Sequence, residues 1–158
     1  MFKKILVPID GSEYSLKALD CAIALAKKFF SKVHVIHIVQ AVTAVSYGTS
    51  FMTWSIYSGS SDITGPSFMI NLRNHLRENG RQILSTTVAK TREASIEAAA
   101  TLLFGSPAEE IINFAEKETI DLIVIGDRGL GSVSRFFLGS VSNNVSRHAP
   151  CPVLIVKT

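Results

Sequence analysis

Short continuous apolar runs alternate along the chain with stretches in which apolar residues recur every three or four positions. Continuous apolar runs of this length are typical of strands that are buried on both faces of a sheet. There are five such runs, and a proline directly precedes the last of them. The predicted strands are 5–9, 33–39, 96–104, 121–126 and 153–156, and the three alanines within 96–104 leave a helix open as an alternative there.

The helical spacing predicts four helices between or beside these strands. Ser12 is a plausible N-cap of the first helix, with Glu13 in the first turn, where the helix dipole favours an acid. A second helix is predicted over 68–86 and a fourth over 140–147. The third is predicted to begin with Ser106 at the N-cap and Pro107 at its first position. The core-facing positions are Leu16, Leu19, Ile23, Ala26 and Phe30 in the first helix, and Ile111, Ile112 and Ala115 in the third.

Strands that alternate with helices imply an α/β fold with a parallel sheet and right-handed crossovers. In such sheets, ligands bind beyond the carboxyl ends of the strands, where the strand order reverses. Two of these ends carry unusual residues, because Asp10-Gly11-Ser12 follows the first strand and a glycine-rich loop follows the fourth. If the two strands are neighbours, both features line one crevice.

The glycine-rich loop has the sequence Gly126-Asp127-Arg128-Gly129, followed after nine residues by Gly139-Ser140. A loop of this kind between a strand and a helix is suited to phosphate, because glycine admits a close anion and helix N–H groups point at it. Turn chemistry alone offers a simpler interpretation, with Ser140 as an N-cap and Asp10 as a turn aspartate. Arg135 fits a phosphate contact and a solvent-exposed position equally well.

The composition indicates one globular domain. The chain has 158 residues, of which 47% are hydrophobic and 18% charged. Because no apolar run reaches the length of a membrane span and the first residues do not form a signal peptide, we expect a cytoplasmic protein with no membrane partner. Cys21 and Cys151 are expected in core packing rather than in a disulfide framework.

The charge pattern gives little reason to expect a nucleic-acid partner. The formal net charge is +3, but basic residues are interleaved with acidic ones and form no tract. The densest basic segment places Arg73, Arg77 and Arg81 on one helix face, which we interpret as a solvated face.

Several motifs together resemble the universal stress protein family. The resemblance covers nearly the whole chain except 41–67. The family's nucleotide-binding branch is similar in its spacing of glycines, which Gly126, Gly129, Gly139 and Ser140 satisfy. The other matching segments are Val7-Pro8-Ile9-Asp10-Gly11-Ser12-Glu13, Gly105-Ser106-Pro107-Ala108-Glu109-Glu110-Ile111, Asp121-Leu122-Ile123-Val124-Ile125-Gly126, Gly139-Ser140-Val141-Ser142 and His148-Ala149-Pro150-Cys151-Pro152-Val153.

This resemblance implies a three-layer α/β/α sandwich of the adenine nucleotide alpha hydrolase-like type, with a five-stranded sheet of order 3-2-1-4-5, and usually a homodimer. It also implies ATP in the crevice, with Asp10 near the ribose or adenine. An acidic Asp127 is unfavourable against phosphate, so it is expected to face solvent or to hydrogen-bond the loop. The implied cofactor-binding residues are Pro8, Ile9, Asp10, Ile38, Gly126, Arg128, Gly129, Gly139, Ser140, Val141 and Ser142.

The sequence gives little indication of other nucleotide motifs, of a catalytic set or of a metal site. The loop is neither a Walker A motif nor a dinucleotide fingerprint, and His34 and His37 point to opposite faces of a strand. No catalytic set or metal site is predicted, and Asp10 is the only evident partner for a metal. We therefore expect a stress or signalling module that binds ATP (or ADP or AMP), with Mg²⁺ or Mn²⁺ carried by the phosphates and slow or no hydrolysis. A weak ATPase that uses Asp10 and a nucleotide-free interaction protein are the alternatives.

The segment 41–67 is the least family-like part of the chain. It has no Lys or Arg, and it carries Tyr47, Phe51, Trp54 and Tyr57 at spacings that suit one helix face. Its length favours a lid or a partner contact over a plain polar loop, which is the alternative.

Overall fold

The structure is a computed structural model that describes residues 1–40, 66–130 and 138–157. Within these residues the chain forms strands and helices in the predicted order. The strands are β1 (Lys4–Pro8), β2 (Lys32–Gln40), β3 (Ala98–Gly105), β4 (Leu122–Gly126) and β5 (Val153–Val156), and the helices are α1 (Glu13–Phe29), α3 (Pro66–Glu93), α4 (Pro107–Lys117) and α5 (Ser140–His148).

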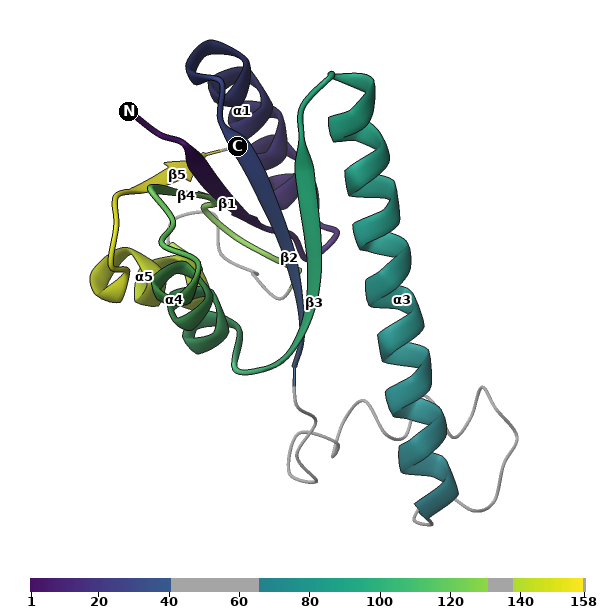
Figure 1. Ribbon diagram of the computed structural model, residues 1–158. Coiled ribbons are helices and arrows are strands. Elements are labelled where there is room, and N and C mark those ends of the chain that lie inside the picture. The colour runs from purple at the N-terminus through teal and green to yellow at the C-terminus, as the bar shows by residue number, and fades with distance from the viewer. Residues whose placement is uncertain (41–65, 131–137, 158) are drawn as a thin grey trace.

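The strands form one parallel sheet of order β3-β2-β1-β4-β5, which confirms the predicted topology. Helices α1 and α3 cover one face of the sheet, and α4 and α5 cover the other (Figure 1). The predicted three-layer α/β/α sandwich is therefore confirmed. The interpretation of 96–104 as a strand is also confirmed, because β3 pairs with β2 along its whole length.

Two hydrophobic clusters, one on each face, explain why the strands read as continuous apolar runs. Ile5 and Val7 point into the cluster beneath α1 and α3, whereas Leu6 between them points into the cluster beneath α4 and α5. Each central strand thus buries both sets of alternating side chains. Cys21 and Cys151 are unpaired and pack against these clusters, as expected.

Helix α1 begins as predicted but departs from its predicted inner face at both ends. The Ser12 hydroxyl caps it by accepting a hydrogen bond from the Ser15 N–H at 3.2 Å. Leu16 is 37% exposed, because the buried stripe passes through Ser15, Ala18 and Ala22 instead. Phe30 is 93% exposed, because the helix ends at Phe29 and a left-handed turn swings the ring outward.

Helix α3 runs seven residues beyond the predicted end at residue 86. The extension contains β-branched residues of low helix propensity. Two of them are buried, and their hydroxyls are satisfied within the helix: Thr87 donates to the Ile83 carbonyl and Thr91 to the Val88 carbonyl. Tertiary burial, rather than propensity, therefore sets the end of α3.

The interpretation of the arginines on α3 as a solvated face holds for Arg73 and Arg81, which are exposed, whereas Arg77 is half-buried. The guanidinium groups of Arg73 and Arg77 lie over the ring of Phe104, 5.8 Å and 5.3 Å from its centroid. Arg81 pairs with Glu78 at 3.6 Å. The face therefore packs partly onto the carboxyl end of β3.

The start of α4 differs in one detail from its prediction. Pro107 occupies the first turn, but the side chain of Ser106 makes no capping hydrogen bond. The predicted lid over 41–67 lies almost wholly outside the described residues, although α3 already includes residues 66 and 67. In the described part of the chain, none of the helices combines the length and apolarity needed to cross a membrane.

Candidate functional site

The loops after β1 and β4 meet because these strands are neighbours in the sheet. Asp10 connects the two loops. One of its carboxylate oxygens, Oδ1, accepts hydrogen bonds from the Ser12 N–H at 2.9 Å and the Ser12 hydroxyl at 2.6 Å. The other, Oδ2, accepts the Leu130 N–H at 3.0 Å. The predicted crevice between the two strand ends is thus bridged by one side chain.

The environment of Asp10 stabilises its charged form. Burial acts to raise the pKa of this half-buried carboxyl, but hydrogen bonds from Ser12, Ser15 and Leu130 lower it further than burial raises it. The net result is a pKa below the ordinary value of 3.8. Asp10 is therefore an anion at neutral pH.

At two glycines of the loop, another part of the chain lies so close that a side chain would not fit. A Cβ on Gly126 would lie 2.8 Å from backbone atoms of Tyr14 in α1, so a side chain there would push the helix away. A Cβ on Gly129 would lie 2.5 Å from Oδ2 of Asp10, in the place that this carboxylate occupies while it bonds Leu130. The glycine spacing thus serves packing and the Asp10 contact.

The amino end of α5 lies directly against the glycine loop. Gly139 is its N-cap and donates its N–H to the Asp127 carbonyl at 2.8 Å. The buried Ser142 hydroxyl has the carbonyl oxygens of Asp127 and Gly139 within 2.9 Å and 3.0 Å. The helix has no side-chain cap and no acid in its first turn. Ser140 is exposed and Val141 half-buried at this end.

Arg128 is engaged by its neighbours in the structure. Its guanidinium lies 4.7 Å from the centroid of the Tyr14 ring, and its Nε lies 3.3 Å from Oδ2 of Asp127. The side chain of Arg128 is 11% exposed. Asp127 therefore pairs within the loop, in line with one of its two expected roles, and its buried Oδ1 has no hydrogen-bond partner among the described residues. A phosphate contact by Arg128 stays a prediction.

The remaining predicted site residues lie at the ends of β1 and β2. Pro8 and Ile9 are buried, and Ile38 is half-buried against the cluster beneath α4 and α5. Sequence reasoning did not assign a role here to His37, whose Nδ1 donates to the Ile9 carbonyl at 2.7 Å. The only indication in the sequence was the alternation of side chains along the strand, which places His34 and His37 on opposite faces. Tyr14 and Leu130 were also missed, and no sequence pattern marks either.

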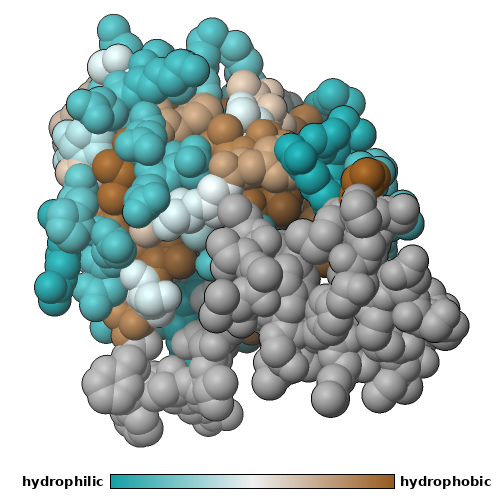
Figure 2. All heavy atoms as spheres, turned by 90° about the horizontal axis from the view of Figure 1, so that it is seen from below, coloured by the Kyte–Doolittle hydropathy of each residue, from teal (hydrophilic) through white to brown (hydrophobic). Residues whose placement is uncertain are grey.

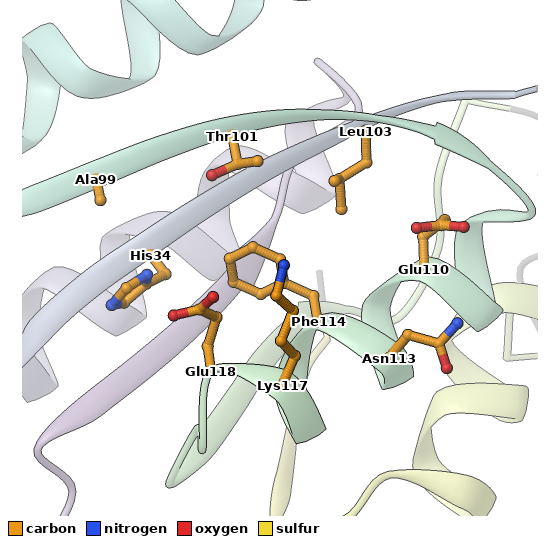
Figure 3. Close-up of a pocket in the computed structure, with 9 residues that line it drawn as sticks. All are labelled: His34, Ala99, Thr101, Leu103, Glu110, Asn113, Phe114, Lys117 and Glu118. Atoms are coloured by element: carbon orange, nitrogen blue, oxygen red, sulfur yellow. The ribbon is translucent and has the colours of Figure 1, made fainter.

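A groove of about 440 Å³ lies away from this crevice, between β3 and α4 (Figure 3). Small residues of β3, Ala99 and Thr101, leave the space open, and Lys117 at the end of α4 and Glu118 after it border the groove. Burial lowers the pKa of His34, which lines the groove near Phe114. The groove shares no residue with the predicted nucleotide site.

The carboxyl edge of the sheet exposes apolar surface beside the loops (Figure 2). Large hydrophobic residues exposed at this edge include Phe104, near the end of β3, and Leu130, after β4. The described residues contain no group of three or more His, Cys, Asp or Glu side chains placed to hold a metal ion.

Comparison with known proteins agrees with the fold and the motifs. The model of the universal stress protein family matches residues 1–157. Universal stress protein YxiE of Bacillus subtilis is 37% identical over 157 residues, which cover 99% of this chain and 100% of that protein. The structure of hypothetical protein MJ0577 superposes with a TM-score of 0.76 at 26% identity, covering 100% of this chain and 97% of the other. An Arabidopsis thaliana family member with AMP bound, At3g01520, has the same fold, with a TM-score of 0.67 at 20% identity over 98% and 91% of the two chains. The chain belongs to the universal stress protein family.

Proposed function

We propose that this protein binds an adenine nucleotide in the crevice between the carboxyl ends of β1 and β4, and that the nucleotide controls its role as a cytoplasmic, homodimeric stress-response module. The observation that carries the proposal is the contact from Asp10 to Leu130, which joins the β1 loop to the glycine loop. A family member with AMP bound supports the same ligand class.

The residues of this site fit an adenine nucleotide. The N–H groups in the first turn of α5 are not capped by a side chain, and this turn contains no acidic residue. These N–H groups can therefore donate hydrogen bonds to a phosphate. The glycines bring the backbone close to that end, and the apolar surface at the strand ends suits a flat base. ATP is the expected ligand, with ADP and AMP as alternatives.

The bonding of Asp10 favours storage of the nucleotide over turnover. Hydrogen bonds from Ser12 and Leu130 hold the pKa of Asp10 below its ordinary value, so its carboxylate is a poor general base in this state. Mg²⁺ or Mn²⁺ would then arrive with the phosphates, which commonly carry such ions. We expect slow hydrolysis or none.

The first test is to denature the purified protein and to identify any released nucleotide by chromatography, followed by calorimetric titration with Mg-ATP. Stoichiometric ATP supports binding with slow hydrolysis, whereas ADP or AMP calls for a turnover assay on Asp10→Ala. Release of nothing, together with no binding on titration, contradicts the proposal and favours a nucleotide-free interaction protein.

A charge variant separates loss of the site from loss of the fold. Ser140→Asp places a negative charge in the first turn of α5, where the dipole stabilises it but where it repels phosphate. We expect ATP affinity to fall at least tenfold, since repulsion of about 1.4 kcal/mol or more at short range gives that factor, while thermal stability is unchanged or raised. Ser85→Asp, at an exposed position on α3, is the matched control and leaves ATP affinity unchanged.

A further inference from the structure

The turn between α1 and β2 combines two locally unfavourable features in one residue. Phe30 has φ 55° and ψ 45°, the left-handed conformation that favours glycine at the end of a helix. Its ring is also 93% exposed. A strained backbone and an exposed aromatic ring at one position each cost stability, and such departures from local rules concentrate at functional sites.

The conformation is imposed by the way α1 ends. The N–H groups of Phe30 and Ser31 both donate to the Ala26 carbonyl, which closes the helix and turns the chain into β2. The preceding Phe29 packs edge-on against Phe2 with the ring centroids 5.6 Å apart. Phe29 thus supplies the packing at this corner, and the Phe30 ring stands outside it.

Three exposed lysines belong to the same corner as this ring. Lys27 and Lys28 are exposed in the last turn of α1, and the exposed Lys3 follows Phe2, whose ring contacts Phe29 at the same corner. Among the described residues, these three lysines take part in no ion pair, whereas Lys32 pairs with Glu97 at 2.7 Å. The Asp121 carboxylate is the acid at this corner, where it accepts the Lys3 N–H at 2.8 Å, so the three lysines leave one apolar ring beside a net positive charge.

We propose that this corner, Lys3, Lys27, Lys28 and Phe30, is a peripheral contact with an anionic phospholipid surface. A stable protein interface needs about 800 Å² from each partner, whereas one phenylalanine supplies only about 150–250 Å². A single protruding ring flanked by lysines suits an interface that can deform around it, with the ring among acyl chains and the ammonium groups at the headgroups. No membrane-spanning helix is required.

The position of the corner leaves the nucleotide crevice open. The turn from α1 to β2 lies at the amino end of the sheet, at the top of Figure 1, and β2 ends at the opposite side. A molecule held at this corner therefore keeps its carboxyl edge accessible to solvent. The inference is independent of whether that edge binds a nucleotide.

The test is co-sedimentation of the full chain with vesicles of equal parts phosphatidylglycerol and phosphatidylcholine, with pure phosphatidylcholine vesicles as the reference. Binding is expected on the anionic vesicles and should weaken with salt. Phe30→Gly should lower the partition coefficient at least tenfold through the lost ring and yet raise Tm by about 2–4 °C by relieving the left-handed strain. Lys27→Gln and Lys28→Gln should each lower the partition coefficient about fivefold.

Two matched variants complete the test. Lys17→Gln removes an exposed lysine from the other half of α1 and should leave the partition coefficient unchanged. Phe30→Leu keeps an apolar side chain and the strained backbone, and should retain most of the binding. Failure of the unaltered chain to sediment with anionic vesicles overturns the proposal, as does undiminished binding by Phe30→Gly. A change of oligomeric state in Phe30→Gly also overturns it, because the ring would then belong to an interface between copies.

Discussion

At the scale of single residues, Asp10 and Gly129 form one packed pair. The carboxylate of Asp10 bonds the Leu130 N–H, and it occupies the space that a Cβ on residue 129 would fill. Asp10→Ala removes charge-assisted hydrogen bonds and should cost about 2 kcal/mol of unfolding free energy. Gly129→Ala should displace the carboxylate and lose part of the same contact. Urea denaturation of both single variants and the double variant measures these costs.

The double variant is the decisive member of this set. Because both changes break the same contact, the double variant should be about 1 kcal/mol more stable than the sum of the single effects predicts. Gly139→Ala is the control, since its Cβ would meet Asp127 and Arg128 at 3.3 Å and 3.4 Å, not Asp10. Additive behaviour of Asp10→Ala and Gly129→Ala would show that the two residues act separately.

The lowered pKa of Asp10 also predicts a pH dependence of stability. Hydrogen bonds to the carboxylate hold its folded-state pKa below 3.8. Its contribution to stability is therefore present above that value and is lost as pH falls through the folded-state pKa. From pH 7 to about pH 3, the urea midpoint should fall more steeply for the unaltered chain than for Asp10→Asn. Parallel curves for the two proteins would assign the acid lability to other carboxyls.

The sequence marked these positions but not how they are bonded. Asp10 was expected to be either a ligand residue or a turn aspartate, and the structure shows the turn contact to Ser12 together with a bond to Leu130 across the crevice. Leu130 lies far from Asp10 along the chain, and only the order of the strands brings the two residues together. The contact between Arg128 and Tyr14 was unpredictable for the same reason.

At the scale of whole elements, the approach of α3 to the sheet depends on Gly80. A Cβ there would lie 2.7 Å from Cδ1 of Leu102 and 2.8 Å from Cδ2 of His37. Leu102 can rotate away, but His37 is held by its hydrogen bond to the Ile9 carbonyl. Gly80→Ala gains about 1 kcal/mol of helix propensity, whereas overpacking costs about 1–3 kcal/mol.

We therefore expect Gly80→Ala to leave the chain less stable, by about 1 kcal/mol, in chemical denaturation. The neighbouring Asn79 is exposed, so Asn79→Ala gains propensity without a clash and should stabilise the same helix. If both variants are stabilised alike, α3 has room to move from the sheet and the close contact is not needed.

The elements themselves were largely predictable, because buried parallel strands and amphipathic helices leave clear apolar periods. The end of α3 was not predictable, since Thr87 and Thr91 oppose a helix by propensity and favour it only through burial. Phe30 illustrates the reverse case. Its spacing continued the apolar stripe of α1, but the helix closed one residue earlier.

At the scale of the whole molecule, strand order determines where the site lies. Neighbouring β1 and β4 bring two loops together that are separated by more than a hundred residues, as the Asp10 contact with Leu130 shows. The topology, and hence the crevice, could be anticipated from alternation of strands and helices and from the family resemblance. The groove between β3 and α4 could not be anticipated from the sequence, because it depends on how far α4 extends over the small side chains of β3.

The sheet also has an outer edge at β5, which suits the homodimer implied by the family resemblance. Val153–Val156 pairs with β4 on one side, and among the described residues no strand pairs with the other. Leu154 on this strand is 37% exposed. Joining two copies along β5 would satisfy the open backbone groups and cover Leu154.

A charge at this edge tests the arrangement. Leu154→Glu should shift the protein from dimer to monomer in sedimentation equilibrium. The interface would otherwise bury one carboxylate from each copy without a partner for its charge. Leu16→Glu is the matched control, since Leu16 is also 37% exposed but lies on α1. That variant should remain dimeric. A dimer that survives Leu154→Glu would exclude the β5 edge as the contact, and the free edge of β3 would become the next strand to test, since it too pairs on one side only in the described part of the sheet.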